Sequence, residues 1–187
     1  MVFWSWYRRD VRYESRYAKL FVRRARCRAC RVTHALLPGF VLQRRLDASE
    51  AIGHAICEVI EASSGVRPTA ASLGIPDTTA RGWLRRFREQ AARIGAAFSA
   101  LAVELGGEVV RPLGDAARLA LSAMRAAFTR AAELPGWSFV GLWQFCSAVS
   151  GGALLATNTD SPYLVIGRRR FMPPVPPTND KDGEDGP

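Results

Sequence analysis

Apolar and polar residues follow two different patterns before and after about residue 45. Over residues 10–26, strand-favouring side chains such as Val11, Tyr13 and Tyr17 stand between arginines in a rough alternation. Beyond residue 45, apolar residues recur three and four positions apart, which is typical of the buried face of an α-helix. The chain therefore predicts a small basic β-ribbon followed by helices.

Start and stop signals place the helices along the chain. Asp47 has the position of an N-cap, with Glu50 three residues later. Gly74 supplies a tight turn between a short second helix and a longer third one. Residues 27–40 favour a turn and irregular chain, since Pro38-Gly39 is a stop signal. The expected helices lie at about 47–60, 68–73, 77–94, 95–105, 113–133 and 138–149.

These elements predict a mostly α protein with a short basic N-terminal β-ribbon, a helix-turn-helix and a helical C-terminal region that packs on the motif or dimerises. The tail is rich in proline and then in acidic residues, so we expect it to be disordered. The expected divisions are a ribbon at 1–45, a helix-turn-helix domain at 46–94, a helical C-terminal region at 95–170 and a disordered tail at 171–187.

Charge changes this picture because it is concentrated at one end. Of the formal net charge of +9, residues 1–45 contribute 12 Lys or Arg against 2 acids, while the rest of the chain is nearly balanced. An arm of this density can neutralise backbone phosphates and release their counterions, which gives salt-dependent affinity without sequence preference. The alternative is a solvated basic surface.

An uncharged segment at residues 134–159 is long enough to span a bilayer. Glycines, serines, a proline and a glutamine interrupt its apolar run. We therefore expect a buried helix that ends at Gly151-Gly152, and no membrane partner. Cysteine usage is too sparse for a disulfide framework and indicates a reducing cytoplasm.

The segment at residues 67–88 reads as helix, tight turn and helix. Ala80, Trp83, Leu84 and Phe87 form the inward stripe of the second of these helices. If this helix lies in the major groove of DNA, the residues of its first turns face base edges. These are Asp77, Thr78, Thr79, Arg81 and Gly82, of which Arg81 is best suited to bidentate contact with guanine.

Further arginines lie one or two turns beyond the first turns, where phosphates are the natural partners. They are Arg85, Arg86 and Arg88, with Arg67 contributing from the preceding helix. These residues are expected to give affinity rather than specificity. The alternative is an ordinary helical hairpin with a basic solvent face.

Cys27 and Cys30 form a CxxC pair, whose spacing lets two thiolates hold a tetrahedral metal ion. A structural zinc site needs four ligands, so the pair is half a site within a partial zinc ribbon. His34 is either a third ligand or a hydrogen-bonded structural residue. Cys57 and Cys146 fall in helical patterns and are expected to be buried.

No catalytic motif is present: the chain has no Gly-rich phosphate loop, no nucleophile elbow and no HExxH. Transposases and integrases hold two metal ions with clustered carboxylates. The acids beyond residue 95 stand in helical patterns instead of on apolar strands. We therefore expect a protein that is not an enzyme by itself.

The run Arg-Cys-Arg-Ala-Cys-Arg-Val-Thr-His-Ala-Leu-Leu-Pro at 26–38, followed by Arg-Gly-Trp-Leu-Arg-Arg-Phe at 81–87, resembles a family of uncharacterised actinobacterial proteins. That family carries a zinc ribbon and a transposase-like helix-turn-helix. The resemblance extends to 141–145 and 150–158. It implies DNA binding in a mobile-element or regulatory setting. A first CxxC usually precedes the ribbon there, so we expect the gene to encode further residues before Met1.

The sequence thus predicts a sequence-specific binder of double-stranded DNA in the cytoplasm, associated with the nucleoid. It would act as a transposon-associated protein or a transcription regulator, with a homodimer and a transposase partner both compatible with the pattern. Zinc is the expected cofactor at the half-site. Two alternatives stay open: a helical module that binds RNA or acidic protein surfaces, and the DNA-recognition subunit of a split transposase.

Overall fold

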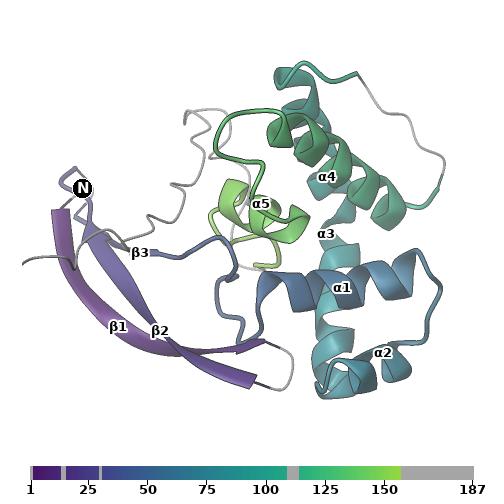
Figure 1. Cartoon of the computed structure of the whole chain (residues 1–187), viewed down its shortest axis with the longest axis horizontal. Helices are drawn as coiled ribbons and strands as arrows, with labels where there is room; N and C mark the ends of the chain where they lie inside the picture. The colour runs from purple at the N-terminus through teal and green to yellow at the C-terminus, as the bar shows by residue number, and fades with distance from the viewer. Residues whose placement is uncertain (1, 14–15, 30, 109–113, 157–187) are drawn as a thin grey trace, which may run out of the picture.

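The computed structural model describes residues 2–13, 16–29, 31–108 and 114–156. Figure 1 shows a β-hairpin beside a group of helices. The described part of the chain is 49% helical and 20% strand, with five helices and a three-stranded antiparallel sheet in the order β1-β2-β3. The prediction of a mostly α protein is therefore wrong, because the protein is mixed α and β. The predicted disordered tail lies outside the described residues.

The hairpin is much longer than the expected short ribbon. Strand β1 runs over Val2–Tyr13 and β2 over Arg16–Arg26, and β3, at Thr33–Leu36, lies in the segment predicted to be irregular. Most of β1 is exposed, so its residues carry no alternation of buried and exposed positions from which a strand can be read. β3 is short and also largely exposed, so it too leaves little pattern in the sequence.

One end of the hairpin is attached to the chain that leads into the first helix. Val11 and Leu20 pack with Val41 and Ala48 in a small apolar cluster. The backbone N–H of Arg12 donates to Leu46 O at 2.8 Å, and the N–H of Ala48 donates to Arg12 O at 2.9 Å. The hairpin is therefore held near its turn, and its open end, where Val2 pairs with Arg26, extends away from the helices (Figure 1).

The helix starts are close to those predicted. Helix α1 is Ser49–Ile60, α2 is Val66–Ser72 and α3 is Asp77–Glu104. The assignment of Asp47 as N-cap is wrong, because Ala48 holds that position without a side-chain cap. Asp47 is instead buried in an ion pair with Arg12, 2.6 Å from the Nε of the guanidinium.

Helix α3 continues well past the predicted end at residue 94. Ile94, Phe98 and Leu101 extend its buried stripe without interruption, so the separate helix expected at 95–105 is the second half of α3. Gly95 does not break the helix, because it lies against α4, where a Cβ added to it would stand 3.5 Å from the Cα of Ala120. A Cβ at this position would make only ordinary van der Waals contact with α4, so the packing of α3 on α4 does not require the glycine.

Helices α4, Ala116–Ala132, and α5, Leu142–Val149, complete the core near their predicted positions. Phe145 is fully buried, and its ring lies 5.4 Å from that of Trp137, 5.6 Å from that of Phe128 and 6.2 Å from that of Phe98. A single cluster of buried side chains extends from Leu42 to Leu155. The helices before and after residue 95 therefore share one core.

The uncharged segment contributes to this core through α5, in which Trp143, Phe145 and Cys146 are buried. Gly151 and Gly152 follow the helix with positive φ, as the predicted stop at this pair requires. Among the described residues, none of the helices has the length and apolar character needed to cross a bilayer.

Candidate nucleic-acid interface

Helices α2 and α3 are joined by a tight turn at Gly74, whose φ is +63°. The N–H of Gly74 donates to Ala71 O at 3.1 Å, and the N–H of Ile75 donates to Ala70 O at 3.0 Å. Ala70 and Ile75 are buried against the core. The turn needs a residue without a Cβ penalty in the left-handed region, which glycine satisfies.

The first half of α3 has one buried and one exposed side. Ala80, Trp83, Leu84 and Phe87 are buried, as predicted. The predicted base-reading and phosphate-binding residues lie on the remaining surface, where Thr78, Arg81, Arg85 and Arg88 are exposed and Asp77, Thr79, Gly82 and Arg86 are half-buried. The helix thus offers a polar and basic surface over three turns.

Arg81 and Asp77 form an ion pair one turn apart, with 2.8 Å between Nη2 of the arginine and Oδ2 of the aspartate. The Arg81 side chain is 65% exposed, so solvent screens this pair and it contributes little to stability. Its effect is on orientation, because it restrains the guanidinium beside the N-terminus of the helix. Arg85 has only a loose partner, Glu89, at 3.8 Å.

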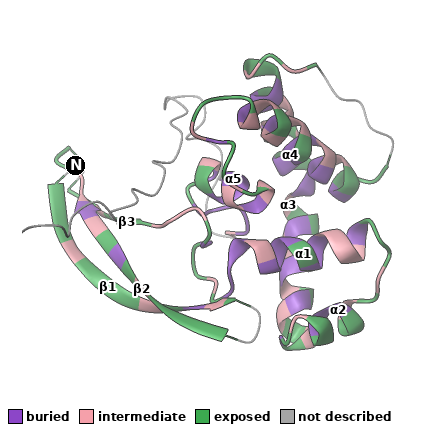
Figure 2. Cartoon of the chain, in the orientation of Figure 1, coloured by how far each residue is buried: buried purple, intermediate pink, exposed green. Residues whose placement is uncertain are grey.

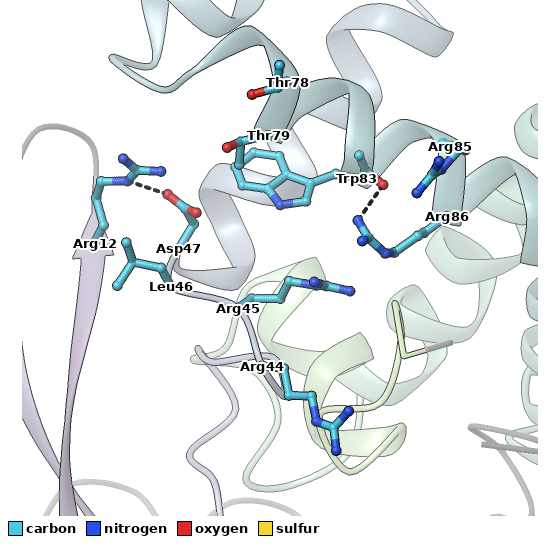
Figure 3. A pocket seen from close by; sticks show the side chains of 11 residues that line it. Arg12, Arg44, Arg45, Leu46, Asp47, Thr78, Thr79, Trp83, Arg85 and Arg86 are labelled. Atoms are coloured by element: carbon cyan, nitrogen blue, oxygen red, sulfur yellow. Dashed lines mark hydrogen bonds and ion pairs between the residues drawn. The ribbon is translucent and has the colours of Figure 1, made fainter. Parts of the chain in front are cut away.

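A recess of about 410 Å³ opens between α3, the turn end of the hairpin and the loop before α1. Figure 3 shows that the arginines around it come from three segments, and that Arg45 and Arg86 extend toward each other. Five of the predicted DNA-binding residues contribute to its lining, together with six that the sequence analysis did not assign to DNA binding. The lining residues are Arg12, Arg44, Arg45, Leu46, Asp47, Thr78, Thr79, Gly82, Trp83, Arg85 and Arg86.

Arg45 is the most constrained cation of the recess. Its Nη2 donates to Leu155 O at 2.8 Å, and its carbonyl oxygen accepts a hydrogen bond from Arg9. Its Nε is buried without a hydrogen-bond partner among the described residues. Burial lowers the pKa of Arg45, and the positive charge of Arg86 lowers it further. An anion between the two guanidinium groups would relieve this repulsion.

Arg86 is held on the opposite side of the recess by its own helix. Its Nη1 donates to Gly82 O at 2.9 Å. The same nitrogen is 2.9 Å from where a Cβ at Gly82 would stand. Glycine at this position therefore lets the guanidinium fold back along the helix and face Arg45 (Figure 3).

Arg12 lines the recess but is neutralised by Asp47. A hydrogen bond from Arg12 Nε to the Asp47 carboxylate raises the pKa of Arg12. Both side chains are nearly buried, so the pair joins the hairpin to the loop that carries Arg44 and Arg45. We assign Arg12 to positioning this loop.

The segment that follows α5 also positions the loop that carries Arg44 and Arg45. The N–H of Gln43 donates to Gly152 O at 2.8 Å, and its side chain donates to Gly151 O at 2.9 Å. The side-chain bond joins residues 108 positions apart in the chain. No local pattern predicts these contacts, and the excess of basic residues over 1–45 is the only feature of the sequence that points to this part of the site.

The remaining predicted DNA-binding residues lie outside the recess. Arg81 and Arg88 line a smaller hollow of about 320 Å³ together with Val66, Leu84, Arg85 and Glu89. Arg67 is exposed on α2 and lines neither hollow. Seven of the nine predicted DNA-binding residues therefore line these two hollows, and Arg67 and Asp77 line neither.

The predicted zinc half-site lies at the turn after β2. Cys27 donates its backbone N–H to Val32 O at 2.9 Å and accepts from the N–H of Arg31 at 3.0 Å. Cys30 lies outside the described residues, and His34 is exposed on β3. In the described part of the chain, no three His, Cys, Asp or Glu side chains are grouped as a metal site requires. The zinc half-site stays a prediction.

No protein-family model, curated protein or solved structure matches this chain.

Proposed function

We propose that the protein binds double-stranded DNA in a sequence-specific manner and is not catalytic by itself. One observation carries the proposal: cations from the loop before α1 and from α3 converge on a recess beside the exposed first turns of α3. Such convergence from segments distant in the chain is what a phosphate-binding surface requires. The half-buried Arg45, facing Arg86, is a cation that an anion would stabilise.

In this proposal α3 enters the major groove with its N-terminal turns. Thr78, Thr79, Arg81 and Gly82 face base edges, with Asp77 orienting Arg81. The DNA backbone passes the recess, where phosphates contact Arg45 and Arg86. The other phosphate contacts come from Arg44, Arg67, Arg85 and Arg88.

The proposed setting is the nucleoid of a cell, where the protein acts as a transcription regulator or in association with a transposon. The resemblance to the zinc-ribbon and helix-turn-helix family supports this setting, and a transposase partner and a homodimer belong to the same proposal. Zinc has no role in any step of the binding proposed here.

A binding selection on random duplex DNA at about 0.15 M salt tests the function. An enriched motif supports a reader of sequence. Binding without enrichment would leave a basic protein that contacts phosphates alone, which contradicts the specific part of the proposal. A preference for RNA over duplex DNA at equal salt would favour the RNA-binding module instead.

A further inference from the structure

The β1–β2 hairpin has a face that the proposed duplex site does not use. Residues directly opposite each other in an antiparallel pair lie on the same face. The register pairs Trp6 with Arg23 and Arg8 with Phe21, so these four share one side of the hairpin. We define the hairpin face by its exposed aromatic and basic residues, which are Phe3, Trp6, Arg8, Tyr17, Lys19, Phe21 and Arg23.

Large aromatic side chains on this face are unusually exposed. The exposed fraction is 63% for Phe3, 60% for Trp6, 63% for Tyr17 and 61% for Phe21. Figure 2 shows that exposure extends along most of both strands. Scattered single apolar residues on a surface need no explanation, but a contiguous group marks an interaction site.

Packing within the hairpin accounts for only part of this group. The rings of Trp6 and Phe21 meet edge to face, with 5.2 Å between their centroids, a contact that stabilises the two strands. Their exposure shows that this contact leaves most of the ring surface open to solvent. The rings also line a hollow of about 690 Å³ together with Phe3 and Arg23.

Cations stand beside the aromatic rings across the whole face. Arg23 is directly opposite Trp6, and Arg8 is opposite Phe21. Lys19 is opposite Asp10, which among the described residues is the one acidic residue on this side. A protein interface core is depleted in such charges, and two copies of this face would repel each other. Flat rings next to cations match a chain of bases joined by phosphates, because bases stack and phosphates pair with arginine.

We propose that the hairpin face binds single-stranded DNA. Bases stack on Trp6 and Phe21, and the phosphates between them contact Arg8, Arg23 and Lys19. The choice of DNA rests on the proposed duplex site. β1 leads directly from this face to Arg12, which lies at the edge of the recess proposed for duplex DNA. A duplex with a single-stranded extension would reach both surfaces and gain affinity from the linkage.

The test uses the full chain and a fluorescent oligothymidine of about 12 nucleotides, within the usual site size of single-strand binding domains. Trp6→Ala and Phe21→Ala are each expected to weaken binding about tenfold. Phe139→Ala is the matched control, since Phe139 is a 49% exposed aromatic outside the hairpin, and it should bind as the unchanged protein does. If Trp6→Ala and Phe21→Ala bind oligothymidine as tightly as Phe139→Ala and the unchanged protein do, the proposal is overturned.

A second pair of variants separates stacking from apolar contact. Trp6→Leu and Phe21→Leu keep an apolar side chain but remove the ring, so they should lose oligothymidine binding as the alanine variants do. Quenching of tryptophan fluorescence by the oligonucleotide should decrease in Trp6→Leu relative to the unchanged protein. Full oligothymidine binding by the leucine variants would contradict stacking, because an apolar side chain without a ring would then be sufficient. If the variants of Trp6 and Phe21 bind oligothymidine normally but lose binding to anionic vesicles, the face binds membranes instead. If they lose self-association in place of DNA binding, the face binds a second copy of the chain.

The two proposals fail separately. Trp6→Ala should keep binding to a blunt duplex, and Arg86→Ala should keep binding to oligothymidine. Loss of oligothymidine binding in Arg86→Ala but not in Trp6→Ala would place single strands on α3 and overturn the hairpin proposal. Circular dichroism of each variant checks the fold.

Discussion

Arg81 and Arg86 lie on the same helix but in different surroundings. Arg81 is exposed beside the N-terminal turn and paired with Asp77, whereas Arg86 folds back toward Gly82 and faces Arg45. A base contact and a phosphate contact differ in what their loss does to binding. Replacing Arg81 should therefore change the selectivity of DNA binding, whereas replacing Arg86 should change its overall affinity.

We expect Arg81→Ala to lower discrimination between related duplex sites, because a bidentate base contact is worth about 1–3 kcal/mol of selectivity. Arg86→Ala should weaken binding to all duplexes alike and reduce the slope of log affinity against log salt by about one. Titrations of a selected site and a scrambled duplex at several salt concentrations measure both. Equal, sequence-independent losses in the two variants would show that α3 does not read bases.

Asp47 and Arg12 form an ion pair near the turn of the hairpin, and both side chains are nearly buried. Asp47→Ala should destabilise the fold by about 3 kcal/mol, because it leaves the Arg12 charge without its partner. Replacing both residues by apolar ones, as in Arg12→Met with Asp47→Leu, should recover much of this loss. Chemical denaturation of the unchanged protein and the two variants measures the effect, and a double variant no more stable than Asp47→Ala would contradict the pairing.

At the scale of elements, two glycines inside helices have opposite roles. A Cβ at Gly53 of α1 would stand 2.1 Å from the indole ring of Trp143 in α5, whereas a Cβ at Gly95 of α3 would meet Ala120 at an ordinary 3.5 Å. Trp143 is buried and has little room to move away. Gly53 is therefore the position at which α5 is brought against α1.

We expect Gly53→Ala to destabilise the protein by about 1–3 kcal/mol through overpacking. Gly95→Ala is the matched control, because both sites are in helix interiors, where alanine is intrinsically favoured by about 1 kcal/mol. It should be neutral or stabilising. Thermal unfolding compares the two variants, and equal stability of both would contradict the close contact of Gly53 with Trp143.

At the scale of the whole molecule, helices distant in sequence are joined by charged side chains. Arg125 of α4 binds both carboxylate oxygens of Glu61 at the end of α1, and Arg118 Nε donates to Ile60 O at 3.2 Å. Glu50 of α1 accepts a hydrogen bond from the N–H of Gln144 in the first turn of α5, at 3.2 Å. These contacts predict how folding depends on pH.

The hydrogen bonds from Arg125 lower the pKa of Glu61 below its ordinary value of 4.5. The pair therefore contributes stability above pH 4.5, and this contribution is lost as the pH falls through the lowered pKa. We expect Glu61→Gln to destabilise the protein at neutral pH and to cost less under acid conditions. Urea denaturation at a series of pH values measures this, and a cost independent of pH would contradict it.

In the same experiment, the contribution of Glu50 to stability should change with pH in the opposite direction to that of Glu61. Burial raises its pKa above 4.5, so the folded state becomes less stable as the pH rises through the raised pKa. Glu50→Gln keeps an acceptor oxygen for α5 and removes the ionisation. Its stability relative to the unchanged protein should therefore improve as the pH rises, and a relative stability that falls instead would contradict the burial of the carboxyl.

The amino-acid sequence by itself determined the helices and the turn at Gly74. Their amphipathic spacing and stop residues act over a few neighbouring positions, so the buried stripe from Ala80 to Phe87 could be predicted correctly. The exposed surface of α3 follows from the same periodicity. The function assigned to that surface stays a proposal.

Only the tertiary structure decided the length of the hairpin, the continuation of α3 and the composition of the recess. Most of β1 is exposed, whereas a strand is recognised in a sequence by the alternation of its buried and exposed residues. α3 continues through Gly95 because the buried side chains of Ile94, Phe98 and Leu101 pack against the rest of the core on both sides of it. Arg45 and Arg86 face each other because Leu155 and Gly152 hold the loop before α1 in place, and contacts over such distances in the chain leave no local signal.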